Sequence, residues 1–247
     1  MYAQAAALIT SAKRCIAFTG AGISVESGVP AFRGENGLWN KYDPATFDIG
    51  YFNQFTLESW EAIRTIFYDL FGQVLPNTAH YGLAELEARG LIQGVITQNV
   101  DNLHFDAGSQ VVHEFHGSLK KVVCMDCKSQ YPIAEICLDP LPPLCEKCQG
   151  ILKPDVVFFG ESIPEVPAKA GFGEAENADC FLLIGTTGSV APANMIPPLA
   201  KRNGATIIEI NPEPSEYTRD TTDVFIQEKA CMAVEKLMEA IDEMERE

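Results

Sequence analysis

Short apolar segments alternate with helical patterns along most of this 247-residue chain. We expect buried strands at residues 15–19, 94–97, 156–159, 181–184, 206–210 and 224–226. Helical patterns occupy the intervals, at residues 3–12, 57–71, 79–88, 193–203 and 230–245. Alternation of this kind predicts a parallel sheet with helices on both faces. The expected fold class is therefore α/β.

Two cysteine pairs, Cys124 with Cys127 and Cys145 with Cys148, bound a segment that breaks this alternation. Seventeen residues separate the pairs, which fits a common zinc-binding spacing. Four thiolates close a tetrahedral shell and leave no position for a reactive water, so the zinc is expected to be structural. We therefore expect a small inserted zinc-binding module. The other cysteines lie in or beside apolar runs and are expected to be buried thiols.

The net charge of −16 constrains the partners of this chain. A field of this sign repels phosphate backbones and suits basic, lysine-bearing partners, so we do not expect nucleic acid as a partner. No apolar run reaches the ~18 residues that a membrane-spanning helix needs, and no secretory signal is recognised. We expect a cytoplasmic protein that does not bind membranes.

The first strand leads into a glycine turn, Gly20-Ala21-Gly22. Such a turn lets backbone amides approach a pyrophosphate at a helix N-terminus. The usual dinucleotide fingerprint has a third glycine where this chain has Val25, which argues against an ordinary dehydrogenase. On the following loop, Arg33 is suited to clamp phosphate oxygens and Phe32 to cover a reactive sugar carbon. The alternative is a plain loop with a surface arginine.

A second polar cluster, Gln98-Asn99-Val100-Asp101, follows the strand at residues 94–97. Its amides and carboxylate could satisfy the donors and acceptors of a carboxamide such as that of nicotinamide. The alternative is an Asx-rich turn that caps the next helix. His116 lies just before the cysteine module, and its imidazole suits proton transfer at neutral pH. The other histidines are expected to be structural.

Taken together and in this order, the motifs resemble those of the sirtuins, the Sir2 family of NAD-dependent protein deacylases, in their bacterial and archaeal form. The resemblance extends over residues 15–230. The matching motifs are Gly20-Ala-Gly-Ile-Ser24, Gly28-Val-Pro-Ala-Phe-Arg-Gly34, Thr97-Gln-Asn-Val-Asp-Asn-Leu-His104, His116-Gly117, the two cysteine pairs, Lys153-Pro-Asp-Val-Val-Phe-Phe-Gly-Glu161, Gly185-Thr-Thr187 and Ile210-Asn-Pro212.

The resemblance implies a Rossmann-like parallel-sheet domain with a small inserted zinc-binding domain. NAD and an acyl-lysine protein or peptide would enter the cleft between them from opposite sides. The implied Rossmann-like domain comprises residues 1–30, 90–120 and 152–247. Residues 31–89 would form the cofactor loop and a helical insertion of the small domain, and residues 121–151 the zinc module.

The resemblance also implies roles for individual residues. The pyrophosphate side would be bound by Gly20, Ala21, Gly22, Ser24, Phe32 and Arg33, the nicotinamide end by Gln98, Asn99, Val100 and Asp101, and the adenosine end by Gly185, Thr186, Thr187, Asn211, Pro212, Glu213 and Ala230. A substrate peptide would add as a strand beside Val157, Phe158, Phe159, Gly160 and Glu161. His116 and Asn99 would be catalytic, and the zinc ligands would be Cys124, Cys127, Cys145 and Cys148.

In the implied reaction the amide oxygen of the substrate attacks the sugar carbon that releases nicotinamide, which gives a covalent imidate. His116 then acts as general base on a ribose hydroxyl, and that hydroxyl completes acyl transfer to the sugar. The products are free lysine, nicotinamide and O-acyl-ADP-ribose. NAD is consumed as a substrate.

Departures from the family pattern concern the acyl group and the adenosine end. Sirtuins that prefer malonyl or succinyl groups carry a Tyr-x-x-Arg pair, and an ungapped count places Arg64 and Phe67 at those positions. We therefore expect acetyl or longer uncharged acyl groups. At the adenosine end, Thr187 and Gly188 replace a serine and a larger aliphatic residue, and Glu228-Lys-Ala230 replaces a glycine-led turn. These changes bear on NAD affinity more than on reaction type.

The sequence leaves four other functions open. A hydride-transferring NAD enzyme would recycle its cofactor; the missing third glycine argues against it, and release of free nicotinamide would distinguish the two. A zinc module that only binds partners would need neither His116 nor Asn99. A protein ADP-ribosyltransferase would leave label from NAD on protein, and a deacylase could prefer longer or unusual acyl-lysine modifications.

Overall fold

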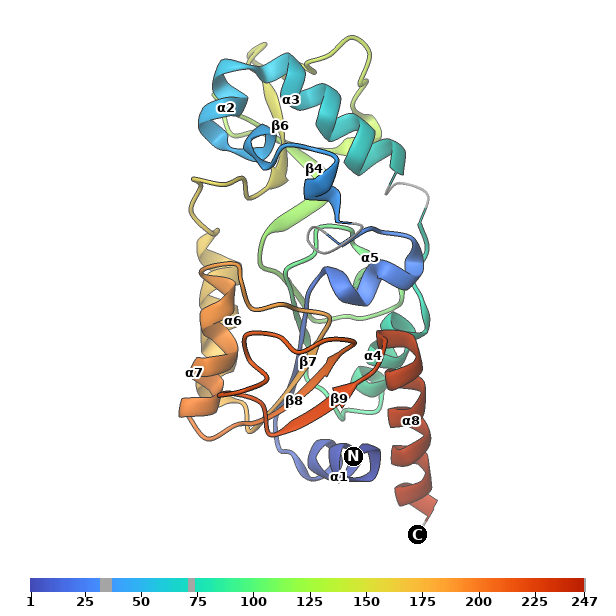
Figure 1. Ribbon diagram of the computed structural model, residues 1–247. Coiled ribbons are helices and arrows are strands. Elements are labelled where there is room, and N and C mark those ends of the chain that lie inside the picture. Colours follow the sequence, from blue (N-terminus) through green and yellow to red (C-terminus); the bar gives the residue numbers. More distant parts are fainter. Residues whose placement is uncertain (32–36, 71–73, 247) are drawn as a thin grey trace.

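The computed structural model of this protein describes residues 1–31, 37–70 and 74–246, which form two lobes (Figure 1). In the larger lobe, over these residues, six parallel strands are ordered β3-β2-β1-β7-β8-β9. Their bounds are β1 Cys15–Thr19, β2 Val95–Thr97, β3 Val112–Glu114, β7 Cys180–Ile184, β8 Thr206–Asn211 and β9 Val224–Gln227. The chain therefore builds the sheet outward from β1 in one direction and then from β7 in the other.

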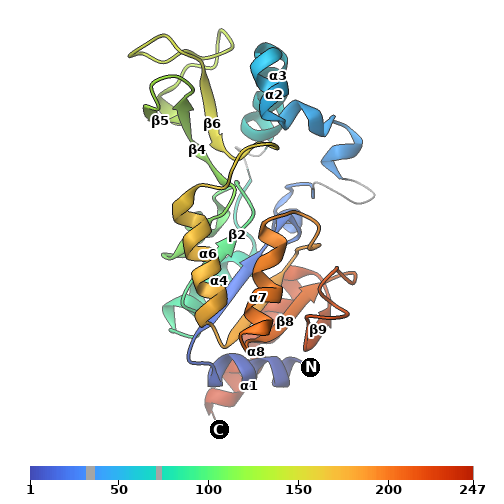
Figure 2. The same ribbon diagram turned by 90° about the vertical axis from the view of Figure 1, so that its left-hand side faces the viewer.

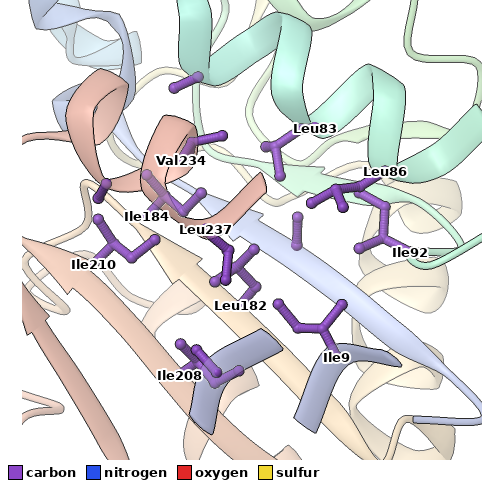
Figure 3. Close-up of a cluster of buried hydrophobic side chains, with 14 of the residues drawn as sticks. Ile9, Leu83, Leu86, Ile92, Leu182, Ile184, Ile208, Ile210, Val234 and Leu237 are labelled. Carbon is purple, nitrogen blue, oxygen red and sulfur yellow. The ribbon is translucent and has the colours of Figure 1, made fainter. Parts of the chain in front are cut away.

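Helices cover both faces of this sheet (Figure 2). One face carries α1 (Tyr2–Ser11), α4 (Thr78–Ala88) and α8 (Ala230–Arg246), and the other carries α6 (Glu165–Asn177) and α7 (Ile196–Arg202). Figure 3 shows the first interface, where Leu182 and Ile208 meet Leu83 and Leu237. Because both faces are buried, the strands are apolar at successive positions rather than at alternate ones.

The smaller lobe is built on a three-stranded antiparallel sheet of order β5-β4-β6. Its elements are β4 Gly117–Cys124, β5 Gln130–Pro132, β6 Leu152–Val156, α2 Ile49–Gln54, α3 Thr56–Ile63 and the π-helical segment Arg64–Leu70. The indole of Trp60 on α3 is buried and donates to the carbonyl of Leu152 at 2.8 Å, which fixes the helix against the sheet. Short α5 (Leu103–Asp106) follows β2, and short 3-10 helices lie at Ala21–Ser27, Leu38–Asn40, Pro44–Phe47, Ile133–Glu135 and Ala193–Met195.

The α/β class and the parallel sheet with helices on both faces are confirmed, but one expected strand was wrong. Residues 156–159 do not form a strand of the large sheet. The strand is β6, it ends at Val156, and it belongs to the small sheet. Beyond it, the amide of Val157 donates to the carbonyl of His116 and that of Phe159 to the carbonyl of Phe47, so the chain leaves the sheet to bridge the lobes.

Residues 31–89, expected as the cofactor loop and helical insertion, divide between the lobes. Helices α2 and α3 pack in the core of the small lobe, whereas α4 packs against α8 on the large sheet. The strands β4 and β6 extend the small sheet on both sides of the expected module at residues 121–151. The domain boundaries stay a prediction. In the described part of the chain, no helix combines the length and apolarity needed to span a bilayer.

Gly82 on α4 tests the contact between α4 and α8. A Cβ at this position would overlap Cγ1 of Val234, a short and stiff side chain. We expect Gly82→Ala to lower the thermal midpoint, because overpacking costs ~1–3 kcal/mol and exceeds the ~1 kcal/mol that alanine gains in a helix. Gly173→Ala on α6 is the matched control, since a Cβ there meets nothing within 4 Å and should raise the midpoint. Equal increases in both variants, measured by calorimetry, would contradict a tight contact.

Candidate active site and metal centre

The residues singled out by the sequence gather at one edge of the large sheet. The glycine turn follows β1, Gln98 to Asp101 follow β2 and Gly185 to Thr187 follow β7, while Asn211 ends β8 and Pro212 and Glu213 follow it. Ala230 opens α8 just after β9, and His116 follows β3. In parallel sheets the carboxyl ends of the strands share an edge, and ligands bind there at the point where the strand order reverses. Phe32 and Arg33 lie outside the described residues.

Two glycine turns touch backbone to backbone where β1 and β7 end. The amide of Gly22 donates to the carbonyl of Gly185 at 2.9 Å. A Cβ on Gly22 would lie 2.5 Å from the Cα of Gly185. Gly185 itself has φ +64, in the left-handed region that favours glycine. This contact leaves no room for a side chain at Gly22 or Gly185.

Ser24 joins Asn99 and Asp101 in one hydrogen-bonded chain. Nδ2 of Asn99 donates to Oγ of Ser24 at 3.1 Å, and that hydroxyl donates to Oδ2 of Asp101 at 2.7 Å. Asn99 also donates to the carbonyl of Gly20 at 3.2 Å, which links the cluster to the glycine turn. Burial raises the pKa of Asp101 above its ordinary value. The cluster therefore presents amide, hydroxyl and carboxyl groups together at the sheet edge.

Two buried histidines lie behind this cluster. Nε2 of His80 is 3.3 Å from Oγ of Ser24, and Nε2 of His104 is 2.9 Å from Oγ1 of Thr19. Their rings are 5.0 Å apart, and burial lowers the pKa of His80 to about 4, so it is neutral. Both histidines are expected from the sequence to be structural, and the contact between His80 and Ser24 is not predicted by it. The signal was the segment Asn77-Thr78-Ala79-His80, because Asn77 and His80 form a capping box at the start of α4.

His116 is held in one tautomer by the loop after β2. Its Nδ1 lies 3.0 Å from the carbonyl oxygen of Gln98. A carbonyl only accepts, so Nδ1 carries the proton and the lone pair is on Nε2. Over the described residues Nε2 has no hydrogen-bond partner. Burial lowers the pKa of His116, so the ring is neutral at neutral pH and Nε2 can accept a proton.

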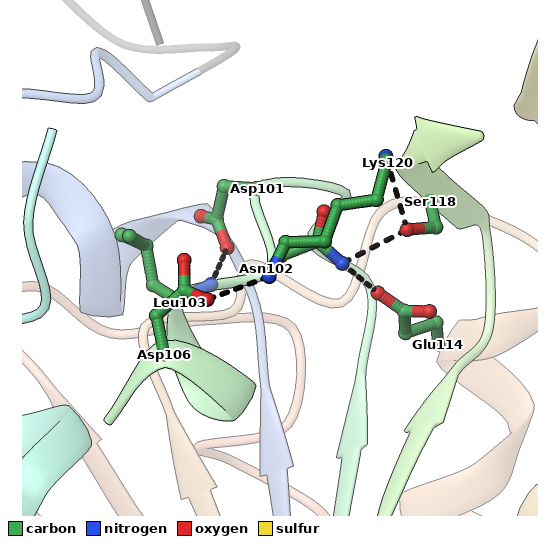
Figure 4. Close-up of polar contacts among 7 residues, drawn as sticks. All are labelled: Asp101, Asn102, Leu103, Asp106, Glu114, Ser118 and Lys120. Carbon is green, nitrogen blue, oxygen red and sulfur yellow. Dashed lines mark hydrogen bonds and ion pairs between the residues drawn. The ribbon is translucent and has the colours of Figure 1, made fainter. Parts of the chain in front are cut away.

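Asn102 ties the segment around His116 to the loop that carries Asp101 (Figure 4). Asn102 has φ 63, and its Nδ2 donates to Oε1 of Glu114 and, at 2.8 Å, to Oγ of Ser118. Glu114 and Ser118 stand on either side of His116 in the sequence. Burial raises the pKa of Glu114 to about 7. The network fixes the position of His116 relative to Asp101.

The turns after β7 and β8 form the expected adenosine end. Oγ1 of Thr186 accepts from Gln98 at 2.9 Å, and its carbonyl accepts from Asn211 at 2.9 Å. Gly188, one departure from the family pattern, has φ +79, and a Cβ there would lie 3.1 Å from the ring of Tyr217. A larger aliphatic residue would not fit against this ring. Pro212 and Glu213 are exposed, whereas Ala230 is buried.

A buried ammonium group shapes the segment that follows β6. Nζ of Lys153 donates to the carbonyl of Val156 at 2.6 Å and to Oε2 of Glu161 at 2.9 Å, and it lies 4.1 Å from the centre of the Phe158 ring. The amide of Phe158 also donates to Glu161 at 2.8 Å. Burial lowers the pKa of Lys153, and the contact with Glu161 opposes that shift.

These bonds leave few free backbone groups between Val157 and Glu161. The amides of Val157, Phe159 and Glu161 and the carbonyls of Phe158 and Phe159 are bonded within the protein. Over the described residues, the carbonyl of Val157 and both backbone groups of Gly160 have no partner. The carbonyl of Glu161 is likewise unpartnered among the described residues, and these are the groups available to an incoming strand.

The four cysteines of the two pairs come together in the small lobe. Their sulfur atoms all lie within 4.8 Å of one another. Cys124 is 3.4 Å from Cys148, and Cys127 is 3.6 Å from Cys145. Zinc bonds each thiolate at ~2.3 Å, which places tetrahedral ligands about 3.8 Å apart. The residues present therefore fit one zinc ion with a closed shell.

Each pair of cysteines forms the same backbone turn. The amide of Lys128 donates to the carbonyl of Cys124 at 3.1 Å, and the amide of Gln149 donates to that of Cys145 at 2.8 Å. Lys128 and Gln149 both have left-handed backbones, with φ 60 and 62. The two matching turns together supply the four thiols, which suits the tetrahedral shell of a structural zinc ion.

The two positions relevant to acidic acyl groups do not place a cation beside the segment after β6. Nη1 of Arg64 donates to the carbonyl of Leu138 at 3.2 Å, and Arg64 borders a surface hollow with Asp69 and Asp139. Phe67 packs against Phe47 with ring centres 5.2 Å apart. Of the two positions found by the ungapped count, Arg64 is therefore turned toward the zinc module and Phe67 is buried in the core of the small lobe.

Comparison with known proteins identifies the family. The sequence profile of the Sir2 family matches residues 20–192. The chain is 45% identical to NAD-dependent protein deacylase 2 of Pyrobaculum aerophilum, over 95% of this chain and 93% of that protein. It is 44% identical to the NAD-dependent protein deacetylase of Caldivirga maquilingensis, over 98% and 93% of the two chains.

Solved structures agree with this result over nearly the whole chain. A mutant Sir2 homologue in complex with ADP-ribose has a TM-score of 0.94 and 36% identity, and covers 98% of this chain and 97% of that one. A Sir2 in complex with a p53 peptide and NAD has a TM-score of 0.89 and 30% identity, with 96% of each chain covered. This chain therefore belongs to the Sir2 family, the sirtuins.

Proposed function

We propose that this sirtuin is an NAD-dependent protein-lysine deacylase that moves an acyl group from lysine to ADP-ribose and releases nicotinamide. The observation that carries the proposal is the neutral His116: its Nδ1 is bonded to the carbonyl of Gln98, the residue before Asn99 in the chain of Asn99, Ser24 and Asp101, and this leaves Nε2 free to accept a proton. Relatives named as NAD-dependent deacylases and deacetylases support it. So does the Sir2 structure that contains both NAD and a p53 peptide.

The strand ends would hold NAD along the sheet edge. The backbone of Gly20 to Gly22 suits the pyrophosphate, Asn99 and Asp101 suit the nicotinamide end, and Asn211 suits the adenosine end. When bound, NAD supplies the sugar carbon that loses nicotinamide and the hydroxyl that takes the acyl group. His116 is the general base, because Nε2 can take a proton from that hydroxyl while Nδ1 stays bonded to Gln98.

The acyl-lysine peptide would be recognised mainly through its main chain. The free carbonyl of Val157 and the free groups of Gly160 can pair with an added strand, which predicts weak dependence on peptide sequence. Because Arg64 and Phe67 place no cation beside these groups, the preferred acyl chains are acetyl or longer uncharged ones. The charge of −16 favours basic proteins over nucleic acid as partners. A reducing compartment such as the cytoplasm would keep the zinc thiols available.

The proposed reaction predicts that nicotinamide release requires an acyl-lysine peptide. Purified protein, NAD and one of several peptides (acetyl-, butyryl-, myristoyl-, succinyl- or glycated lysine) are analysed by mass spectrometry. We expect equal amounts of nicotinamide, free lysine peptide and O-acyl-ADP-ribose, with acetyl or longer uncharged chains preferred. Label from NAD that ends on protein would indicate ADP-ribosyl transfer instead, and intact NAD in every reaction would refute both.

Substitution of His116 tests its role as general base. We expect His116→Ala to lower kcat by about 10²- to 10⁴-fold, the usual contribution of such a group, with zinc content unchanged. His113→Ala is the matched control, because His113 lies on β3 in the same segment and is also half-buried. A fully active His116→Ala protein would rule out the assignment.

Loss of one zinc ligand should unfold the small lobe. Cys145 is buried in its core, and zinc contributes on the order of 10 kcal/mol in small four-ligand modules. We expect Cys145→Ser to lose the metal and to melt earlier, as measured by elemental analysis and circular dichroism. The expectation of a buried thiol was wrong for Cys137, which is exposed and lies outside the cluster, so Cys137→Ser should behave as wild type. Retention of zinc by Cys145→Ser would contradict the four-thiolate site.

A further inference from the structure

Glu209 is a fully buried carboxylate in the middle of β8. Side chains alternate along a strand, so Ile207, Glu209 and Asn211 share one face, while Ile208 and Ile210 point into the core shown in Figure 3. Glu209 is 0% exposed, and no lysine or arginine pairs with it in the described part of the chain. An isolated buried carboxylate is destabilising unless hydrogen bonds satisfy it, so this residue calls for an explanation.

Neutral donors satisfy both oxygens of Glu209. Oε1 accepts from Nδ2 of Asn211 at 2.9 Å and from Oγ1 of Thr218 at 3.0 Å. Oε2 accepts from Thr218 at 2.9 Å and from Oγ1 of Thr222 at 2.6 Å. Glu209 therefore joins the end of β8 to the loop that follows it.

The orientation of the Asn211 carboxamide follows from its two neighbours. Nδ2 lies 2.9 Å from the carbonyl oxygen of Thr186 and 2.9 Å from Oε1 of Glu209. Both neighbours only accept, so the nitrogen must face them and its two protons are both used. Oδ1 then points away from Glu209, and no described residue donates to it. Asn211 thus offers a bare acceptor at the end of the strand.

We propose that Glu209 is a positioning residue that fixes Asn211 with its oxygen toward the adenosine ribose, and so selects a free ribose hydroxyl over a phosphorylated one. The inference rests on the proposed function, because it takes the adenosine end of NAD to lie at Asn211. A hydroxyl can donate to Oδ1. A phosphate ester offers only acceptor oxygens at neutral pH, and it would meet Oδ1 with the carboxylate of Glu209 behind it.

Binding of two nucleotides without chemistry tests this selection. Calorimetric titration with ADP-ribose and with 2′-phospho-ADP-ribose gives the ratio of the two dissociation constants. For the wild type we expect preference for ADP-ribose by on the order of ten- to a hundredfold, the cost of leaving a buried acceptor without its donor. Comparable binding of both nucleotides by the wild type would overturn the proposal.

Three variants separate positioning from stability. Glu209→Met removes the acceptor, so Asn211 can turn and ADP-ribose should bind about tenfold more weakly, with the preference reduced. Glu209→Gln keeps an oxygen for Asn211 and should restore ADP-ribose affinity. Thr222→Val is the matched control, because it removes a partner of Glu209 but leaves the contact with Asn211.

Thermal unfolding of each variant shows whether it folds. We expect Thr222→Val to melt earlier and still bind ADP-ribose as wild type does. Positioning by Glu209 would be refuted if folded Glu209→Met kept the wild-type ratio of affinities for the two nucleotides. It would also be refuted if Thr222→Val lost as much ADP-ribose affinity as Glu209→Met. Deacylation by the wild type is assayed separately. If the wild type binds ADP-ribose selectively but does not deacylate, the proposed function alone is refuted. If the wild type deacylates but Glu209→Met keeps the wild-type ratio of the two dissociation constants, this inference alone is refuted.

Discussion

The point where β1 and β7 lie side by side determines where everything else in this protein is placed. The chain builds the sheet away from this pair in both directions, so the turns after the two strands diverge and leave room between them. The backbone contact between Gly22 and Gly185 closes the bottom of that space without using side chains. Parallel pairing then brings the ends of β2, β3 and β8 to the same edge. The polar groups of the site come from distant segments for this reason.

The second constraint is the junction between the lobes, which runs through His116. The residue after it, Gly117, has φ 84 and begins β4, while the amide of Val157 bonds to the carbonyl of His116 as the chain returns. Asn102 adds a side-chain link from the loop after β2 to Glu114 and Ser118. His116 is thus positioned by three segments at once. The zinc module stabilises the lobe at the far end of the same strands, so metal binding supports the position of His116 indirectly.

Much of this could be predicted from the sequence, for physical reasons. The central strands are buried on both faces, so their apolar runs stand out, and the cysteine spacing identifies the metal centre without further context. The short strands β3 and β5 and the register of β4 depend on partners far away in the sequence, which a local pattern does not contain. Helix α6 was missed because Pro167, Gly171 and Gly173 weaken its helical pattern, although packing against α7 stabilises it. Residues 156–159 appeared to be a core strand because Val156 and Phe158 pack in the core of the small lobe, although Phe159 is exposed.

Buried polar groups at the sheet edge show most clearly what the sequence pattern concealed. Asp101 lies in the loop after β2, whereas Lys153 and Glu209 lie within β6 and β8 and bond to the irregular segments that follow these strands. All three bond mainly to backbone groups, hydroxyls or amides. Apolar packing is non-directional, so it does not fix an irregular backbone segment in one conformation. A buried charged group that is hydrogen-bonded to several partners does. The visible signal was a charge within an apolar run, as in Ile207-Ile-Glu-Ile210. Such a charge in a core strand is better interpreted as the support of an adjacent loop than as an exception to the burial pattern.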